Sequence, residues 1–416
     1  MTTPVRAQAS PIIATRSRTF AAFDVPQFGR LWSIGLLWNL TRWMCVFLCS
    51  YFVSEETDSP FLVQIVGASF FAPMFLTGAL GGVISDRLDR RRTMLYLTMI
   101  LVPASATMAA VTFSGGLRVW MVYLFILAVG LTMVVDMTSR RALVYDIVGA
   151  ERVTNALALE ALAMTGGTLV GNAGAGTIIS AVGIGSAFAV AAVCYGFSAI
   201  LIAGLPSTAA RRSVSATKPH VVADIKAAVA YVRAHRALIS ILGVTIVMNS
   251  FYFSFTPMVP LFADDMGVNA LWAGVLASAP AFGSMFGTLL IARGSGITRG
   301  QAYVCGSALA LTFLGVFAAS GWYPVALIAL IVAGFGTSGF ATMQSALVML
   351  NSDDEMRGRA LGILSMSIGA LPFSMLLLGG TAQAIGPQLG VVVSTVLGVA
   401  VLALWSRSHP EAYRQA

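Results

Sequence analysis

Four charged residues lie inside long apolar stretches of the sequence, where ionisable side chains are costly and usually functional. They are two arginines and two acids: Arg42, Asp136, Arg140 and Glu160. Asp136 and Arg140 are four residues apart, so on a helix they share a face and can form an ion pair. A nonpolar environment favours a protonated carboxylic acid, whereas a nearby arginine favours the carboxylate. Such a set of residues can take up and release a proton when the distance between acid and arginine changes.

Two acids are therefore candidates for proton coupling, Asp136 and Glu160. For Asp136 the alternative is a permanent ion pair with Arg140 that only stabilises the helices. Arg42, which has Asn39 three residues before it, could instead attract an anionic substrate.

Apolar helices must position these side chains. Only 42 of the 416 residues are charged and 57% are hydrophobic, which excludes a soluble globular protein. The apolar stretches are about 20 residues long, enough to cross a bilayer as helices. The sequence therefore predicts an all-α membrane protein with twelve transmembrane helices. Their expected limits are 29–53, 61–84, 92–113, 119–145, 155–180, 184–205, 236–261, 270–291, 301–320, 323–347, 358–382 and 387–406.

The distribution of arginine and lysine predicts the orientation. Basic residues gather in alternate loops, and the opposite side of the predicted membrane carries mostly acids. That side holds Arg118, Glu55, Glu56, Asp58, Asp264 and Asp265. By the positive-inside rule we expect both termini in the cytoplasm, with the protein in a bacterial inner membrane. Anchoring near anionic lipid headgroups accounts for the net charge of +8 without a nucleic acid partner.

The composition predicts no cofactor, no metal and no enzymatic activity. All four cysteines lie within predicted spans, but His220, His235 and His409 lie in loops or tails. Neither Lys218 nor Lys226 follows a phosphate-binding glycine loop, so we expect transport to run on an ion gradient or downhill. No catalytic constellation is visible, and the absence of a long soluble domain argues against a receptor.

A polar stretch separates the spans into two groups of six. We predict a tail at 1–28, an N-terminal bundle at 29–205, a linker with an amphipathic helix at 206–235, a C-terminal bundle at 236–406 and a tail at 407–416. A faint repeat at an offset of 204 relates Leu143 to Leu347 and Ala156 to Ala360. Six spans per half place the repeats in parallel, as in transporters built from two six-helix bundles related by a pseudo-two-fold axis.

The loop after the second span carries a distinctive run of residues, Gly82-Val-Ile-Ser-Asp86-Arg87-Leu-Asp89-Arg90-Arg91-Arg92. A glycine lets a neighbouring helix approach closely, and Asp86 can accept from free amides at a helix amino terminus. The arginines can pair with acids or with exposed carbonyls at a helix end. Such a loop could hold two bundles together in one state and release them in another.

This loop resembles the Gly-x-x-x-Asp-Arg-x-x-Arg-Arg pattern of the major facilitator superfamily. Further runs resemble its efflux branch, which contains enterobactin exporters, macrolide efflux proteins and transmembrane secretion effectors. These runs are Phe28-Gly-Arg-Leu-Trp32, Ser59-Pro60, Asn155-Ala156-Leu157 and Arg357-Gly358-Arg359. The resemblance implies a gating role for Gly82, Asp86, Arg87, Arg90 and Arg91, stabilising the state open to the outside. Because spans one, four and five line the central cavity in the resembling family, the resemblance also implies that the four charged residues Arg42, Asp136, Arg140 and Glu160 meet in the cytoplasmic half of that cavity.

The fifth span contains the glycine-rich run Gly167-Thr-Leu-Val-Gly171-Asn172-Ala-Gly174-Ala-Gly176. Glycines four apart allow close packing of helix backbones. The run is similar to the Gly-x-x-x-Gly-Pro-x-x-x-Gly stretch of antiporters in the superfamily, with Asn172 in place of the proline. This similarity implies antiport. Asn172 places a polar amide within the span and is a candidate for lining the substrate cavity, as are Asn39, Arg42 and Arg140 of the other spans.

The second bundle has no charged residue deep inside its spans; Arg236 and Arg359 stand at the ends of theirs. Its candidate cavity residues are Asn249, Tyr252, Phe255 and Met258 in the seventh span and Gln344 in the tenth. Aromatic and thioether side chains suit amphipathic ligands of variable shape. Ordinary helix packing is the alternative explanation for each of them.

Together these features predict a monomeric, proton-coupled exporter of amphipathic small molecules, such as a drug or a siderophore, working by alternating access. The main alternative is a lipid or lipid-precursor flippase on the same scaffold, for which a lateral hydrophobic groove would be expected. Nutrient uptake is a weaker alternative because the span-five glycines favour antiport.

Overall fold

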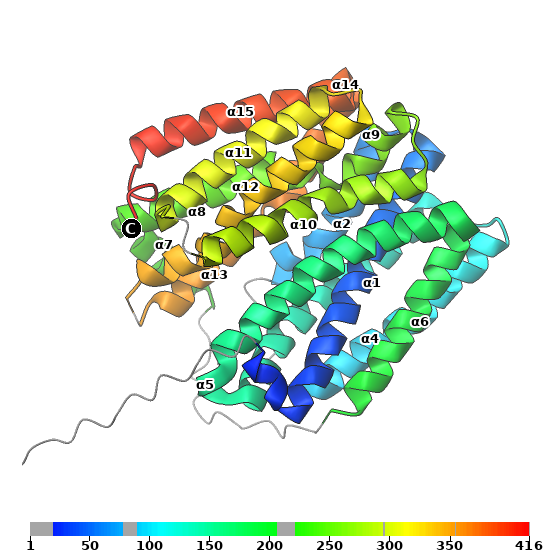
Figure 1. Ribbon diagram of the computed structural model, residues 1–416, viewed down its shortest axis with the longest axis horizontal. Helices are drawn as coiled ribbons and strands as arrows, with labels where there is room; N and C mark the ends of the chain where they lie inside the picture. Colours follow the sequence, from blue (N-terminus) through cyan, green and yellow to red (C-terminus); the bar gives the residue numbers. More distant parts are fainter. Residues whose placement is uncertain (1–19, 78–89, 206–220, 294–295, 354, 416) are drawn as a thin grey trace, which may run out of the picture.

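The computed structural model describes residues 20–77, 90–205, 221–293, 296–353 and 355–415. Within these ranges the elements of regular secondary structure are all helices, joined by short turns (Figure 1). The first half contains η1 (Ala21–Asp24), α1 (Pro26–Thr57), α2 (Pro60–Thr77), α4 (Arg90–Phe113), α5 (Val119–Val182) and α6 (Ile184–Ala203). The second half contains α7 (Val221–Ala234), α8 (Arg236–Phe251), η2 (Phe253–Met258), α9 (Val259–Asp265), α10 (Ala270–Ala292), α11 (Arg299–Ala319), α12 (Tyr323–Leu350), α13 (Arg357–Ile368), α14 (Leu371–Ile385) and α15 (Pro387–Ser408).

The helices account for the twelve predicted spans. Within the described residues, eleven helical segments are long and apolar enough to cross a membrane, and α2 contains a shorter apolar stretch. Helix α5 comprises the fourth and fifth spans, joined at Gly149, where φ is 72° and ψ is 175°. Glycine adopts this left-handed conformation without the steric cost that other residues incur. The connection between the two spans is therefore a single sharp kink.

Two predicted spans are interrupted. The seventh is divided into α8 and α9 by the short helix η2, which contains Pro257. Proline lacks the backbone donor that a continuous helix needs, so the helix breaks there. The eleventh is divided into α13 and α14 at Gly369, shortly before Pro372. A continuous helix was expected in both places, and the prolines are the physical reason for the difference.

Equivalent positions of the two halves have similar surroundings. Leu143 and Leu347 are both buried, as are Ala156 and Ala360. The turn between α5 and α6 contains Gly183 with φ of 85°, and the turn between α14 and α15 contains Gly386 with φ of 90°. This second correspondence was not recognised in the sequence, because a lone glycine does not reveal its backbone angles.

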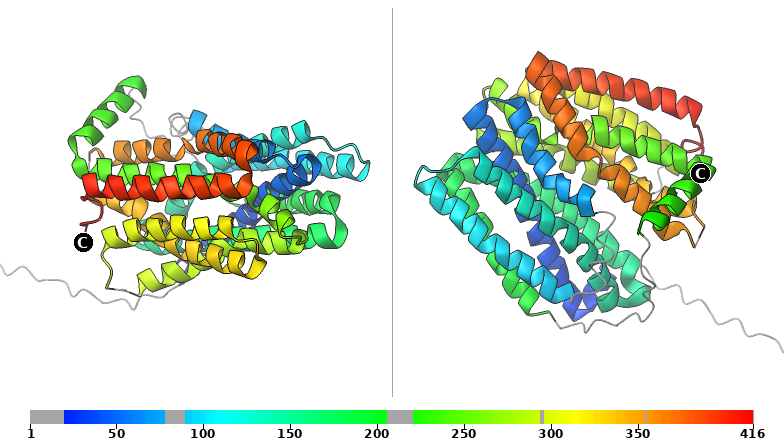
Figure 2. Two further views of the ribbon diagram at one scale, coloured as in Figure 1. Left: turned by 90° about the horizontal axis from the view of Figure 1, so that it is seen from above. Right: turned by 180° about the vertical axis from the view of Figure 1, so that it is seen from behind.

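Two helix pairs join the halves, α2 with α14 and α5 with α10 (Figures 1 and 2). Ser59 donates to Gln383 at 2.6 Å, and Gln64 donates to the Ser254 carbonyl at 2.8 Å. In the other pair, Asn172 donates to the Ala277 carbonyl at 3.1 Å. Among the described residues, these hydrogen bonds lie toward the end of the molecule that contains the turns at Gly183 and Gly386. This is the end that the sequence predicts to face outside.

Glycines allow the α5–α10 contact. A Cβ added at Gly274 would lie 2.6 Å from the Asn172 carbonyl oxygen and 2.9 Å from the Cα of Gly176. Earlier along α5, Gly167 and Gly171 face the backbone of α1 around Leu40. The glycine-rich run of the fifth span therefore packs against two helices, one in each half, as the spacing predicted for close backbone contact.

Replacing Gly274 with alanine should lower the free energy of unfolding by about 1–3 kcal/mol, because the added methyl group overlaps backbone atoms of α5. Gly174→Ala is the matched control, since a Cβ there meets no atom within 4 Å. The midpoints of thermal unfolding of the purified variants measure the difference. Equal midpoints for the two variants would contradict tight packing at Gly274.

Candidate functional site

The structure brings the four candidate charged residues of the predicted spans together in the first half. Asp136, Arg140 and Glu160 lie on α5, on either side of the kink at Gly149, and Arg42 lies on α1. Because the kink folds the fifth span back along the fourth, residues far apart in sequence become neighbours. We call these four residues the charge cluster. It carries no net formal charge when both acids are ionised.

A bidentate ion pair forms the centre of the charge cluster. Arg140 donates through Nη2 to Asp136 Oδ1 at 2.5 Å and through Nε to Asp136 Oδ2 at 3.1 Å. Both residues are buried, with 5% and 7% of their surfaces exposed. Charge-assisted bidentate hydrogen bonds are the strong form of this interaction. The pairing predicted from the four-residue spacing is therefore present.

Glu160 lies beside the remaining nitrogen of Arg140. A Cβ added at Gly35 of α1 would lie 2.8 Å from Arg140 Nη1 and 3.1 Å from Glu160 Oε2, so the two groups converge on the same glycine. Neither Arg140 Nη1 nor Glu160 Oε1 has a hydrogen-bond partner, although both atoms are buried. Glu160 also interacts electrostatically with Arg140 and Asp136. Gly35 thus provides the space in which an acid and an arginine face each other without a hydrogen bond.

Arg42 contacts aromatic rings instead of an acid. Its guanidinium carbon lies 4.9 Å from the ring centroid of Trp38 and 5.4 Å from that of Trp43, which are cation–π distances. Nη2 donates to Asn39 Oδ1 at 2.5 Å, and Nε has no partner. No ion pair of Arg42 occurs within the described part of the chain. The acid that interacts electrostatically with Arg42 is Asp136.

Little free space surrounds the charge cluster. Asp136 and Trp38 line a narrow crevice with Thr98 of α4 and Thr132 of α5. These residues belong to helices of the first half, so the crevice lies inside that half. The expectation that the four charges line a cavity stays a prediction for other conformations.

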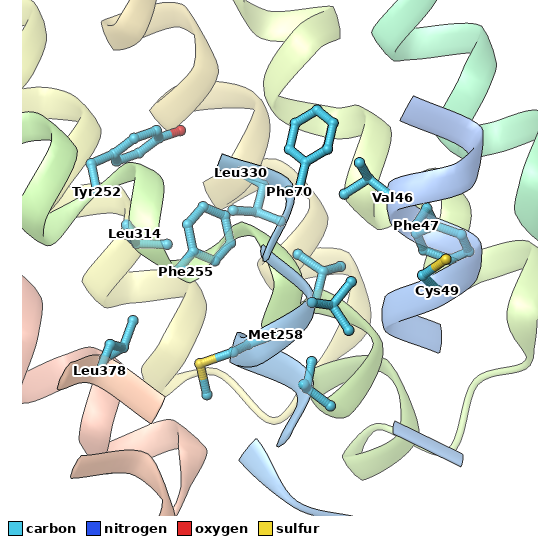
Figure 3. Packing of buried hydrophobic residues seen from close by; sticks show 14 of the residues in the cluster. Val46, Phe47, Cys49, Phe70, Tyr252, Phe255, Met258, Leu314, Leu330 and Leu378 are labelled. Atoms are coloured by element: carbon cyan, nitrogen blue, oxygen red, sulfur yellow. The ribbon is translucent and has the colours of Figure 1, made fainter. Parts of the chain in front are cut away.

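The candidate residues of the second half occupy two environments. Tyr252, Phe255 and Met258 are at most 2% exposed and belong to the hydrophobic core, as Figure 3 shows. Asn249 donates to the Thr245 carbonyl at 2.9 Å, and Gln344 donates to the Thr245 hydroxyl at 3.3 Å. The two amides therefore lie close together on α8 and α12, as neighbours within the second half.

Asn172 makes a contact between the halves. Its amide hydrogen bond to Ala277 joins α5 to α10, as described above. Asn39 accepts from Arg42 and donates to the Gly35 carbonyl at 2.9 Å, so it belongs to the surroundings of the charge cluster. These two amides were predicted to line a cavity, and in this conformation their hydrogen bonds are made to the protein.

The gating-loop residues are only partly within the described chain. Gly82, Asp86 and Arg87 lie outside the described residues, and Arg90 begins α4. Arg91 donates through Nε to the Ile202 carbonyl at 3.2 Å and also to the Ala203 carbonyl. The helix dipole places partial negative charge at the carboxyl end of α6, so a cation is stabilised at these carbonyls. One predicted role of the loop arginines, binding exposed carbonyls at a helix end, thus occurs for Arg91.

Sequence reasoning missed several residues near these sites. Gly35 and the aromatic pair Trp38 and Trp43 gave no signal, because glycine and tryptophan are ordinary in apolar helices. Gln64 was missed too, although a polar amide at the start of an apolar span was visible.

Two helical halves joined at one end, with a buried charge cluster in one of them, define a membrane transporter of the major facilitator superfamily. The sequence of residues 17–414 matches the family of transmembrane secretion effectors, and the chain belongs to this family. That family and its relatives are membrane transporters, which agrees with the resemblance seen in the sequence.

Relatives with known names have low identity but nearly full coverage. Macrolide efflux protein A of Streptococcus pyogenes is 21% identical over 360 residues, which are 84% of this chain and 88% of that protein. A staphyloferrin A transporter of Staphylococcus aureus is 20% identical over 378 residues, 89% of this chain and 93% of that protein. The chain is thus a multi-pass membrane transporter with bacterial relatives.

Solved structures of transporters have the same fold. A bacterial homologue of the human lysosomal transporter Spinster, in an inward-facing and unoccupied conformation, aligns with a TM-score of 0.70 at 13% identity, covering 93% of this chain and 98% of that chain. A D-xylose–proton symporter aligns with a TM-score of 0.68 at 16% identity, covering 93% and 99%. At these identities the similarity shows the fold alone.

Substituting Asp136 with asparagine should lower the free energy of unfolding by about 3–5 kcal/mol, because Arg140 would remain buried without its carboxylate. The double variant Asp136→Asn, Arg140→Gln should recover much of the loss, since it removes the unpaired charge. Thermal unfolding of the purified proteins measures both effects. A single variant as stable as the wild type would show that the pair does not stabilise the bundle.

Proposed function

We propose that this transporter exports amphipathic small molecules, such as a drug or a siderophore, in exchange for protons and by alternating access. The observation that carries the proposal is the contrast between the two acids of the charge cluster. Asp136 uses both carboxylate oxygens in its pair with Arg140, whereas Glu160 Oε1 has no partner.

This contrast favours Glu160 as the coupling acid. Protonating Asp136 would break a bidentate ion pair, whereas protonating Glu160 breaks no hydrogen bond described in the structure. The Glu160 residue as a whole is also less buried than Asp136, which is 7% exposed. Arg140 Nη1 faces Glu160 and attracts its ionised form. Release of the proton would therefore strengthen the attraction between the two parts of α5.

Helix α5 links the proton site to the contact between the halves. The part after the kink carries Glu160, and further along it carries Asn172 and Gly176, which contact α10. Twelve residues of helix separate Glu160 from Asn172, a rise of about 18 Å. A change in the attraction between Glu160 and Arg140 would shift this helix and so alter its contact with α10.

The contact between the halves supports alternating access. Its hydrogen bonds lie toward the predicted outer end, an arrangement expected for a state open to the cytoplasm. We propose that both termini are cytoplasmic, that the protein is a monomer in the bacterial inner membrane, and that the chain divides into two six-helix bundles at the linker. The names of the relatives, a macrolide efflux protein and a staphyloferrin A transporter, support export of small molecules.

Glu160→Gln should abolish efflux that depends on the proton gradient, because glutamine cannot exchange a proton. The assay follows efflux of several fluorescent compounds from cells, with and without a protonophore. Glu151→Gln is the matched control, since it makes the same substitution at an exposed position of α5. Protonophore-sensitive efflux by Glu160→Gln equal to that of the wild type would refute the assignment of Glu160.

Linking the halves at the predicted outer end should stop transport, because alternating access requires that end to open. Ser59 and Gln383, whose side chains meet at 2.6 Å, are suitable positions for two cysteines joined by a short bis-methanethiosulfonate cross-linker, which forms a reducible disulfide bond with each thiol. Efflux should fall to the level of cells without the protein and return when a reducing agent cleaves the linker. Each single cysteine variant treated in the same way is the control, and unchanged efflux in the cross-linked protein would contradict alternating access.

A further inference from the structure

Two arginines hold the carboxyl end of α6. Arg30, near the start of α1, donates through Nη1 to the Gly204 carbonyl. Arg91 of α4 donates to the Ile202 and Ala203 carbonyls. The carbonyls at a helix end together carry about half an elementary negative charge, which is less than the two positive charges that face them. Neither arginine forms an ion pair within the described residues, so the end of α6 keeps an excess of positive charge.

A cavity opens beside Arg30 at this end of the first half. Its volume is about 400 Å³, and its lining residues are Pro26, Gln27, Arg30, Gly204 and Leu205. Figure 1 shows why these two segments meet, since α1 begins where α6 ends and the two helices pack against each other. We call this cavity, with Arg30 and Gln27 as its polar side chains, the corner cavity.

The corner cavity presents hydrogen-bond donors, and none of its lining residues is acidic. The guanidinium of Arg30 has five N–H donors, of which the Gly204 carbonyl uses a single nitrogen. Both Arg30 and Gln27 are exposed, so the remaining donors are accessible. The nearest acid along the chain, Asp24 of η1, is one charge against the two of Arg30 and Arg91. Because the planar fork of an arginine binds phosphate oxygens two at a time, the corner cavity suits a phosphate group.

An exposed apolar face of α6 leads away from the corner cavity. Val193, Phe197, Ile200 and Gly204 follow one another at intervals of four, three and four residues, so they share a face of the helix. The three apolar side chains are between 54% and 71% exposed, because α6 packs against α1, α4 and α5 on its other faces. Val193 lies about 16 Å along the helix from Gly204. On a membrane-spanning helix, such a face contacts acyl chains.

We propose that the corner cavity binds an anionic phospholipid, with the phosphate held by Arg30 and the acyl chains along the exposed face of α6. A phospholipid carries its phosphate directly above its acyl chains, which is the order of Arg30, Ile200 and Phe197 along this face. A free phosphate ion would leave the apolar face uncovered. A net negative charge on the lipid balances the excess positive charge at the end of α6.

This lipid site is separate from the charge cluster. Arg30 precedes Arg42 by twelve residues on α1, a rise of about 18 Å. The proposal therefore concerns a second ligand of the protein and does not depend on the exported substrate or on proton coupling.

Equilibrium binding of tritiated dioleoyl phosphatidylglycerol to the purified full-length protein in detergent, measured by scintillation proximity, tests the proposal. Binding should saturate, and unlabelled dioleoyl phosphatidylglycerol should compete about tenfold better than dioleoyl phosphatidylcholine, which has the same chains and no net charge. Arg30→Gln should weaken binding by about tenfold, because it removes the charged fork while keeping a side chain of similar length. Inorganic phosphate at millimolar concentration should not compete.

Arg407→Gln is the matched control, because Arg407 is an exposed arginine in the last turn of α15 and does not line the corner cavity. It should bind phosphatidylglycerol like the wild type. Arg30→Lys retains the positive charge beside the Gly204 carbonyl, so it controls for folding and should bind more tightly than Arg30→Gln.

Equal weakening by Arg30→Gln and Arg407→Gln would show general attraction to a basic surface and would overturn the proposal. Equal binding of Arg30→Lys and Arg30→Gln, or equal competition by phosphatidylcholine, would contradict the role of charge. Competition by inorganic phosphate would assign the corner cavity to the free ion instead of a lipid. None of these results depends on efflux, so the outcome is independent of the proposed transport.

Discussion

The bidentate ion pair between Asp136 and Arg140 determines how the other charges of the first half are arranged. Asp136 is fully used by this pair, and one nitrogen of Arg140 remains directed toward Glu160. Arg42 is left with aromatic and amide contacts. An unpaired charge is expensive in a low-dielectric interior. Because Arg140 takes both carboxylate oxygens of Asp136, the neighbouring Glu160 and Arg42 are left with incomplete pairing. The charge cluster is balanced overall, yet three of its buried atoms lack a hydrogen-bond partner: Arg42 Nε, Arg140 Nη1 and Glu160 Oε1.

Incomplete pairing is useful where a group must change its protonation state. A carboxylate with a full set of hydrogen bonds resists protonation. Glu160 instead lies near the guanidinium group of Arg140, and its Oε1 accepts no hydrogen bond. The location of Glu160 after the kink of α5 adds a mechanical consequence. The same helix contacts α10 through Asn172 and Gly176. The electrostatic interaction of Glu160 and the packing between the halves therefore act on the same part of α5.

The two halves contribute different chemistry on one scaffold. Charge lies in the first half, where the helices are tightly packed around it, while the second half contributes neutral amides and aromatic rings. The breaks at η2 and at Gly369 fall in the second half. A break in a membrane helix frees backbone groups and turns side chains out of the regular helical pattern. It therefore gives the second half a less regular surface than continuous helices would.

The sequence by itself determined the fold class, the number of spans and the ion pair, because apolar length and four-residue spacing act locally along a helix. It also predicted close backbone packing at the span-five glycines and the kind of contact that Arg91 makes. Only the tertiary structure decided that Asp136 is satisfied and Glu160 is not, since this depends on how α5 folds back at Gly149 toward Gly35 of α1. The hydrogen bond between Gln64 of α2 and the Ser254 carbonyl of η2, across the halves, was equally hidden. These residues are separated by long stretches of chain, and no local periodicity records which faces of distant helices come into contact.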